Sequence, residues 1–302
     1  MTVKRYVIVI GAMKSGTTTL FDLLARHPRI AAARGKEPGY FGLDEAHAKG
    51  ADWYEGLFGF DPARHDWRLE ASTDYTKAPF VETVGARMAA HPEAEFRLIY
   101  IMRHPLRRIE SHARHVQRAK KEIGQRISPI SDHSLDQGLS AVNLAVSDYA
   151  RQLDRWRDVW DAGHLHLMTL EGLKSDAEGE MARVWDWLGL EPPEGPVLTR
   201  SNAADAKVED HPLWARVTRA APLLAIGKAL LPQRLRRRLR ETLKRPVRSE
   251  GRFELSLEEE ATLFSLYDPG VRRLEREYGL DLTLWDWRDP RSSGTVPSGK
   301  RV

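Results

Sequence analysis

The sequence predicts a single α/β domain in which helices flank a central parallel sheet. Three runs are predicted as strands, at residues 6–10, 67–71 and 97–102, and the first and the third are mostly apolar, as buried strands are. Segments with the spacing of amphipathic helices lie between them, and strands that alternate with helices are typical of a parallel sheet. With 302 residues, the chain is long enough to bury a full core.

The first apolar run leads into a loop with two glycines, one lysine and three consecutive threonines. Gly11 and Gly16 allow backbone N–H groups to turn toward an anion, and the positive end of a helix from about Thr17 adds to the attraction. The glycine spacing matches the nucleotide-triphosphatase pattern G-x-x-x-x-G-K-[ST], although Thr17 occupies the lysine position and Lys14 supplies a cation from inside the loop. We therefore expect a P-loop-type three-layer domain with a phosphate cradle.

The elements of the N-terminal half follow from local signals. Leucine spacing predicts a helix at 17–27 before Pro28, and a weak second strand follows at 30–33. A helix is expected at 79–90, and a Pro at the first turn begins another at 105–121. One aromatic cluster stands at helical spacing, which is more typical of a core than of a binding site; its members are Trp53, Tyr54, Leu57 and Phe58.

The C-terminal half begins with a Ser-, Asp- and Gly-containing stretch at 122–137, which predicts a surface loop. The expected elements after it are a helix at 140–161, a strand at 164–169, a helix at 178–188 closed by Gly189, a long charged helix at 257–278 and a segment at 282–287 that packs back.

The third apolar run ends in Arg103 and His104. A nucleotide triphosphatase needs an acidic residue there to hold magnesium, so the sequence predicts a cradle without a metal clamp. His112 and His115 are three residues apart on an expected helix, but no third ligand accompanies them. We therefore expect surface histidines and no bound metal.

Composition narrows the cellular setting. The chain has no cysteine, which excludes disulfides, a thiolate nucleophile and a cysteine zinc site and agrees with a reducing compartment. The N-terminal residues lead straight into a short strand, and no apolar stretch is long enough for a signal sequence or a bilayer span. These features predict a soluble, cytoplasmic protein.

The positive charge is concentrated in one segment. Residues 216–252 hold twelve Lys or Arg and two Glu, whereas the whole chain has a net charge of +4. Leu235, Leu239 and Leu243 recur among arginines, which predicts an amphipathic helix with a cationic face. This basic segment could be a solvated helix on the domain, a lid, or a contact with an anionic membrane surface or another polyanion. No nucleic-acid partner is expected.

Two motifs in order carry a resemblance to a known family. The loop at 13–19 and the later stretch R-H-P-L-R-R-I-E-S at 103–111 resemble those of sulfotransferases that use 3′-phosphoadenosine 5′-phosphosulfate (PAPS), and the resemblance covers most of residues 5–287. Stretches at 51–58, 70–75 and 170–174 look like those of bacterial members and of the heparan-type Golgi branch.

The resemblance implies a set of donor-binding residues. In that family the first loop grips the 5′-phosphosulfate, and the arginine and serine of the second motif hold the 3′-phosphate, for which a guanidinium offers bidentate hydrogen bonds. Carried over to this chain, the set is Lys14, Ser15, Gly16, Thr17, Thr18, Thr19, Arg103 and Ser111, with Asn202, Lys207 and Arg252 as candidates in a donor-covering loop. The product would be adenosine 3′,5′-bisphosphate (PAP), and no metal is required.

The catalytic pair implied by the resemblance is Glu37 and Lys14. Glu37 matches the position of the catalytic glutamate of the heparan-type branch, and Lys14 would stabilise the charge that grows on the departing 5′-phosphate. The alternative for Glu37 is a surface carboxylate paired with Lys36. The chain departs from the family pattern at Gly39, where a histidine is usual, and at Ala71, where many members carry a lysine.

Three further points stay open at the level of sequence. Glu70 and His104 are the other candidate bases. The domain is expected to span 1–288, with the donor-covering and basic segment at 200–252 and a flexible tail at 289–302. The leading function is sulfuryl transfer to an acceptor hydroxyl, with a carbohydrate or glycolipid favoured. The alternatives are a P-loop kinase or nucleotide triphosphatase, and a polyanion- or membrane-binding protein that acts through the basic segment.

Overall fold

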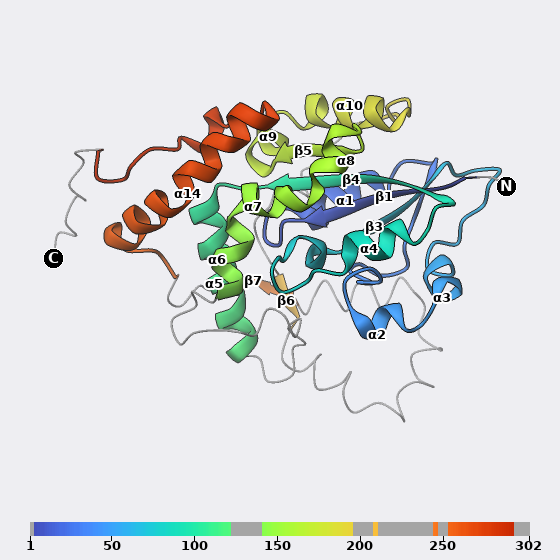
Figure 1. Ribbon diagram of the computed structural model, residues 1–302, viewed down its shortest axis with the longest axis horizontal. Coiled ribbons are helices and arrows are strands. Elements are labelled where there is room, and N and C mark those ends of the chain that lie inside the picture. The colour runs from blue at the N-terminus through green and yellow to red at the C-terminus, as the bar shows by residue number, and fades with distance from the viewer. Residues whose placement is uncertain (1–2, 122–140, 196–207, 211–243, 247–252, 293–302) are drawn as a thin grey trace. The chain divides into compact units, whose positions relative to one another are not determined.

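A five-stranded parallel sheet forms the centre of the protein. The computed structural model describes residues 3–121, 141–195, 208–210, 244–246 and 253–292. The strands are β1 (Lys4–Gly11), β2 (Ile30–Ala32), β3 (Trp67–Ala71), β4 (Ala94–Met102) and β5 (Leu165–Thr169), in the order β2-β3-β1-β4-β5 with every neighbouring pair parallel (Figure 1). The α/β class predicted from the sequence is confirmed.

Helices lie between the strands along the chain and after the last strand of the sheet. Those of the N-terminal half are α1 (Thr17–Leu24), α2 (Asp44–His47), α3 (Ala51–Glu55), the 3₁₀ helix η1 (Thr73–Thr76), α4 (Val84–Ala89) and α5 (Pro105–Lys121). Those of the C-terminal half are α6 (Ala141–Ser147), α7 (Tyr149–Leu153), η3 (Asp154–Trp156), α8 (Arg157–Asp161), α9 (Leu170–Ser175), α10 (Ala177–Leu188), α14 (Leu257–Tyr278) and η4 (Thr283–Trp285).

The chain divides into two compact units. One comprises Met1–Val197 and Phe253–Val302 and contains the sheet. The other is Leu198–Arg252, in which β6 (Val208–Asp210) pairs antiparallel with β7 (Lys244–Pro246). The expected basic helix around residues 235–243 and the loop at 122–137 lie outside the described residues, as does the tail from residue 293.

Side chains of β1 alternate between two buried faces, as strand geometry requires. Tyr6, Ile8 and Ile10 join a large core with residues from α5 to α7, the aromatic segments at 40–58 and α14. Val7 and Val9 are equally buried and belong to the opposite face, and α1 packs against β1 and β3. Apolar side chains on both faces explain why the strand reads as a continuous hydrophobic run.

Two expected helices differ from the structure. The helix predicted at 140–161 is divided into α6, α7, η3 and α8, because the Asp148 carboxylate accepts a hydrogen bond from the Arg151 N–H and so starts a new helix. The helix predicted from residue 79 begins only at Val84. The N–H groups of Phe80 and Val81 both donate to the carbonyl of Lys77, which closes a turn before it.

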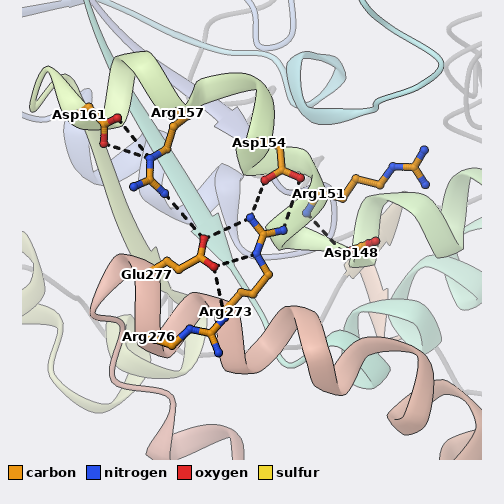
Figure 2. A network of polar contacts seen from close by, with 8 residues as sticks. All are labelled: Asp148, Arg151, Asp154, Arg157, Asp161, Arg273, Arg276 and Glu277. Carbon is orange, nitrogen blue, oxygen red and sulfur yellow. Dashed lines mark hydrogen bonds and ion pairs between the residues drawn. The ribbon is translucent and has the colours of Figure 1, made fainter.

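Helix α14 packs beside α5 and α7 (Figure 1) and is joined to η3 and α8 by a network of ion pairs (Figure 2). Arg273 lies 2.7 Å from Asp154 and 3.2 Å from Glu277, and Arg157 of α8 lies 3.8 Å from the same Glu277. Exposed pairs contribute little one at a time. Together they orient a helix whose buried face, including Leu263 and Leu274, supplies part of the core.

No helix among the described ranges is both long enough and apolar enough to cross a membrane.

The start of α14 depends on a capping box. Ser256 accepts a hydrogen bond from the Glu259 N–H through its side chain, and the Glu259 carboxylate accepts one from the Ser256 N–H. We expect Ser256→Ala to lower the free energy of unfolding by about 1 kcal/mol in urea denaturation. Ser265→Ala, inside the same helix, is the matched control and should change stability by less than about 0.5 kcal/mol. Equal effects would show that the cap does not limit the stability of α14.

Candidate functional site

The loop that follows β1 lies against the end of β4. The two strands pair in parallel, and the N–H of Ala12 donates a hydrogen bond of 2.7 Å to the carbonyl of Ile101. Lys14 and Arg103 therefore leave neighbouring strands at the same edge of the sheet. This is the edge at which ligands bind in open α/β sheets.

The conformation of the loop requires glycine at Gly16. Its φ is 89°, in the left-handed region, and it occupies the N-cap position of α1. A Cβ added there would lie 2.6 Å from Cδ1 of Leu170, the first residue of α9. Lys14 also has a positive φ of 71°, which is uncommon for a residue with a side chain. Both the backbone conformation and the close contact with α9 thus hold the loop in shape.

A buried arginine forms a hydrogen bond to the backbone of the loop that follows β1. Arg108 of α5 is fully buried, and its Nη1 donates to the carbonyl of Met13 at 3.3 Å. Its Nε donates to Ser147 Oγ at 2.7 Å, and its Nη2 donates to Asn143. Burial lowers the pKa of this guanidinium. Arg108 was not singled out from the sequence, although the apolar residues at 109, 113 and 116 place it beside the buried face of α5.

Residues 36–41 form a second loop that is tied at three points to the segment from the end of β3 into η1. The Glu37 N–H donates to the carbonyl of Ala71 at 2.9 Å, and the Gly39 N–H donates to Ser72 Oγ at 3.0 Å. The Phe41 N–H donates to the hydroxyl of Tyr75 at 3.0 Å. These bonds keep Glu37 at the carboxyl edge of the sheet, where the sequence predicted it.

Lys36 joins the two loops. Its ammonium donates to Thr18 Oγ1 at 2.7 Å and to Thr17 Oγ1 at 3.2 Å, both in the first turn of α1. The same nitrogen lies 3.4 Å from Oε1 of Glu37, whose side chain is 48% exposed. The ion pair considered as an alternative for Glu37 is therefore present, and it lies beside the phosphate cradle. Sequence reasoning did not assign Lys36 to the site.

Glu70, one of the alternative bases, is fully buried. It accepts a hydrogen bond of 3.1 Å from the Ser72 hydroxyl, and burial raises its pKa to about 7. Through Ser72 it supports Gly39 and so the loop that carries Glu37. Its place in the fold is that of a positioning residue beneath the site.

The two histidines discussed from the sequence are shielded to different extents: His104 is half-buried and His112 is buried. Burial lowers the pKa of His104 to about 4, and its ring packs against Trp287 with the ring centroids 5.2 Å apart. His112 has no exposed surface, so the expectation of a surface histidine is wrong. Burial, followed by the charges of Arg108 and Lys77, lowers the pKa of His112 to about 2. The burial of His112 could not be predicted from the sequence, because α5 is strongly charged overall.

A family model for the sulfotransferase domain matches residues 4–204, which is more than half of the chain. The chain belongs to the sulfotransferase family. It is 30% identical over 188 residues to mouse heparan sulfate glucosamine 3-O-sulfotransferase 6, covering 61% of this chain and 52% of the mouse protein. The human protein of the same name is 28% identical over 245 residues, covering 78% of this chain and 67% of that protein. The chain thus spans about half to two thirds of the length of these relatives.

The fold is also that of a solved sulfotransferase. A crystal structure of a sulfotransferase from Alicyclobacillus acidocaldarius matches with a TM-score of 0.59 and 20% identity, covering 93% of this chain and 98% of that one. At this identity the likeness concerns the fold alone. It agrees with the parallel sheet and the flanking helices described above.

The residues of this sulfotransferase domain fit an anionic donor at the edge of β1 and β4. The Ser15 hydroxyl is buried and has no hydrogen-bond partner among the described residues, and Thr18 is exposed at the first turn of α1. Lys14 follows Met13, whose carbonyl accepts a hydrogen bond from Arg108 of α5, and Arg103 follows β4 directly before α5, so both cations are attached to segments that adjoin the same helix. Ser111 lies on this helix and is half-buried.

Some predicted site residues are not covered. Asn202, Lys207 and Arg252 lie outside the described residues. Within the described ranges, no group of three or more His, Asp or Glu side chains is arranged to hold a metal ion.

The raised pKa of Glu70 predicts a pH dependence of stability. Because its folded pKa of about 7 exceeds the ordinary value of 4.5, the folded state binds the proton more tightly than the unfolded state. The resulting stabilisation is fully present below pH 4.5 and is lost as the pH rises through 7. Gln stays uncharged, so we expect Glu70→Gln to become more stable than the parent as the pH rises from 4.5 to 7, by on the order of 3 kcal/mol in the free energy of unfolding.

Urea denaturation of both proteins at a series of pH values measures this difference. The lowered pKa values of His104 and His112 favour the folded state as the pH rises toward 6.5, but they act equally in both proteins and cancel in the difference. Parallel stability curves for Glu70→Gln and the parent would show that the buried carboxyl is not protonated in the folded state.

Proposed function

We propose that this chain is an enzyme that transfers a sulfuryl group from PAPS to an acceptor hydroxyl on a carbohydrate or glycolipid, with Glu37 as the base. The observation that carries the proposal is the position of Glu37. Its neighbour Lys36 bonds to the hydroxyls at the start of α1, and its own N–H is bonded to the end of β3. Glu37 therefore directly follows the residue that contacts the phosphate cradle, and its carboxylate is open to solvent.

In this mechanism Glu37 accepts the proton of the acceptor hydroxyl while the acceptor oxygen forms a bond to sulfur. The bond between sulfur and the 5′-phosphate oxygen breaks, and its electron pair stays on the phosphate of PAP. Lys14 and the N–H groups of residues 16–19 stabilise that charge, because they are oriented before the reaction. Arg103 and Ser111 hold the 3′-phosphate of the donor.

The carbohydrate acceptor is supported by the relatives. Proteins named as heparan sulfate glucosamine 3-O-sulfotransferases align over 61% to 78% of the chain. The alternative of a magnesium-dependent kinase or triphosphatase lacks support at the end of β4, where Arg103 and His104 stand in place of a carboxylate. The polyanion-binding alternative depends on residues 216–252, most of which lie outside the described residues.

An acceptor panel tests the reaction. Purified protein is given radiolabelled PAPS with an N-sulfated heparan-type oligosaccharide, a neutral glycolipid or a phenol, without added metal. Label is expected on the oligosaccharide or the glycolipid. Label on the phenol alone would contradict the acceptor class. Turnover of ATP with magnesium, and no transfer from PAPS to any acceptor, would contradict the proposed activity.

Three substitutions separate donor binding from proton transfer. We expect Lys14→Ala and Arg103→Ala each to weaken PAP binding at least about tenfold, because each removes a charged hydrogen-bond donor to a phosphate. Glu37→Gln should bind PAP at least as tightly as the parent and lose about 100-fold or more in transfer rate. Calorimetry and the label assay measure the two quantities. Unchanged PAP affinity in all the variants would mean that these roles are misassigned.

A matched control for charge is Glu45→Gln. Glu45 is an exposed glutamate on α2. Its substitution should leave both PAP affinity and transfer rate at the parent values.

A further inference from the structure

Lys36 is bonded to both halves of the proposed site at once. Its ammonium has three protons, and three acceptors surround it: the hydroxyls of Thr17 and Thr18 and the carboxylate of Glu37, at 3.2, 2.7 and 3.4 Å. Only 23% of its side chain is exposed. A lysine held this closely between two loops is not an ordinary surface cation.

The two threonine hydroxyls lie in the first turn of α1, the part of the cradle that faces an anion. When Lys36 donates to them, they act as acceptors and retain their own protons for another partner. An anionic phosphate is a stronger acceptor for an ammonium than a hydroxyl is, because its oxygens carry a negative charge that attracts the ammonium directly. An anion seated at this helix end therefore competes for Lys36.

The backbone around the ammonium is unusual. Among the described residues, the non-glycine residues with positive φ are Lys14, Glu37 and Asp286, and the first two lie on the loops that face each other here. Such a conformation is unfavourable for a residue with a side chain and persists only where its surroundings hold it in place. The three hydrogen bonds to the segment from the end of β3 into η1 do so for Glu37. The position of Glu37 relative to Lys36 is thus built into the fold.

We propose that Lys36 is a cation shared between the base and the donor. Without donor it pairs with Glu37, and bound donor draws its ammonium to the phosphosulfate oxygens, which releases the Glu37 carboxylate to accept the acceptor proton. This inference rests on the proposed function of Glu37. It makes Lys36 a donor-binding residue that also positions the base. It predicts that Glu37 can accept a proton only after the donor has bound.

A double-mutant cycle on PAP affinity tests the sharing. Glu37→Gln removes the competitor for Lys36, so it should tighten PAP binding about threefold to fivefold. Lys36→Met should weaken PAP binding about tenfold. In the double variant the gain from Glu37→Gln should vanish, because no ammonium remains to be released, and the affinity should equal that of Lys36→Met alone. Calorimetry with PAP measures all four proteins without an acceptor and without turnover.

Two further variants control the result. Lys36→Arg keeps the charge and should retain PAP affinity within about threefold. Lys49→Met removes a lysine outside the proposed site, whose ammonium lies 4.4 Å from the ring centroid of Trp53, and it should bind PAP like the parent. Thermal denaturation should give melting temperatures for the Lys36 variants close to that of the parent, since the N–H groups of Glu37, Gly39 and Phe41 keep the loop attached.

The proposal is overturned if Lys36→Met binds PAP as tightly as the parent, or if the gain from Glu37→Gln persists in the Lys36→Met background. Either result would leave the proposed transfer activity of the parent protein standing. Conversely, an intact cycle in a protein that transfers no label would overturn the role of Glu37 as base and not the competition for Lys36. The two failures are therefore distinguishable.

Discussion

The pairing of β1 with β3 on one side and β4 on the other is the constraint on which the site depends. Both faces of β1 are apolar, so hydrophobic burial alone would tolerate a slip of the strand. Contacts at its end set the register instead. The Thr76 hydroxyl donates to the carbonyl of Ile10 at 2.9 Å, and Gly11 packs so closely on Thr76 that a Cβ would lie 2.0 Å from its Oγ1. A slip would move Lys14 away from Arg103.

Two polar residues beneath the site, Arg108 and Glu70, are buried and hydrogen-bonded to the segments that hold the loops, which restrains both loops. Arg108 links the first loop to α6, and Glu70 supports the second loop through Ser72 and Gly39. An unsatisfied buried polar group costs more than a made hydrogen bond contributes, so each of these partners resists displacement. The groups proposed to meet substrate, Lys36 and Glu37, are by contrast partly exposed and can exchange partners.

Several features followed from the sequence because their signals are local. The helices at 105–121 and 257–278 have the predicted ends, since a Pro at the first turn and a capping box mark their starts. Gly189 closes α10 with φ of 69°, as expected of a C-cap glycine. The helix predicted at 140–161 was wrong because one hydrogen bond, from the Arg151 N–H to Asp148, interrupts a pattern that is otherwise helical throughout.

The sequence by itself determined the α/β class, the strand, glycine loop and helix at 4–24, and the family, because glycine spacing and apolar periodicity are patterns within a short stretch of chain. Only the tertiary structure decided that His112 is buried, that Arg108 holds the loop and that Lys36 lies between Glu37 and the start of α1. These facts depend on which segments meet across the sheet. Lys36 and Thr18 are 18 residues apart, and nothing in the spacing between them indicates that their side chains touch.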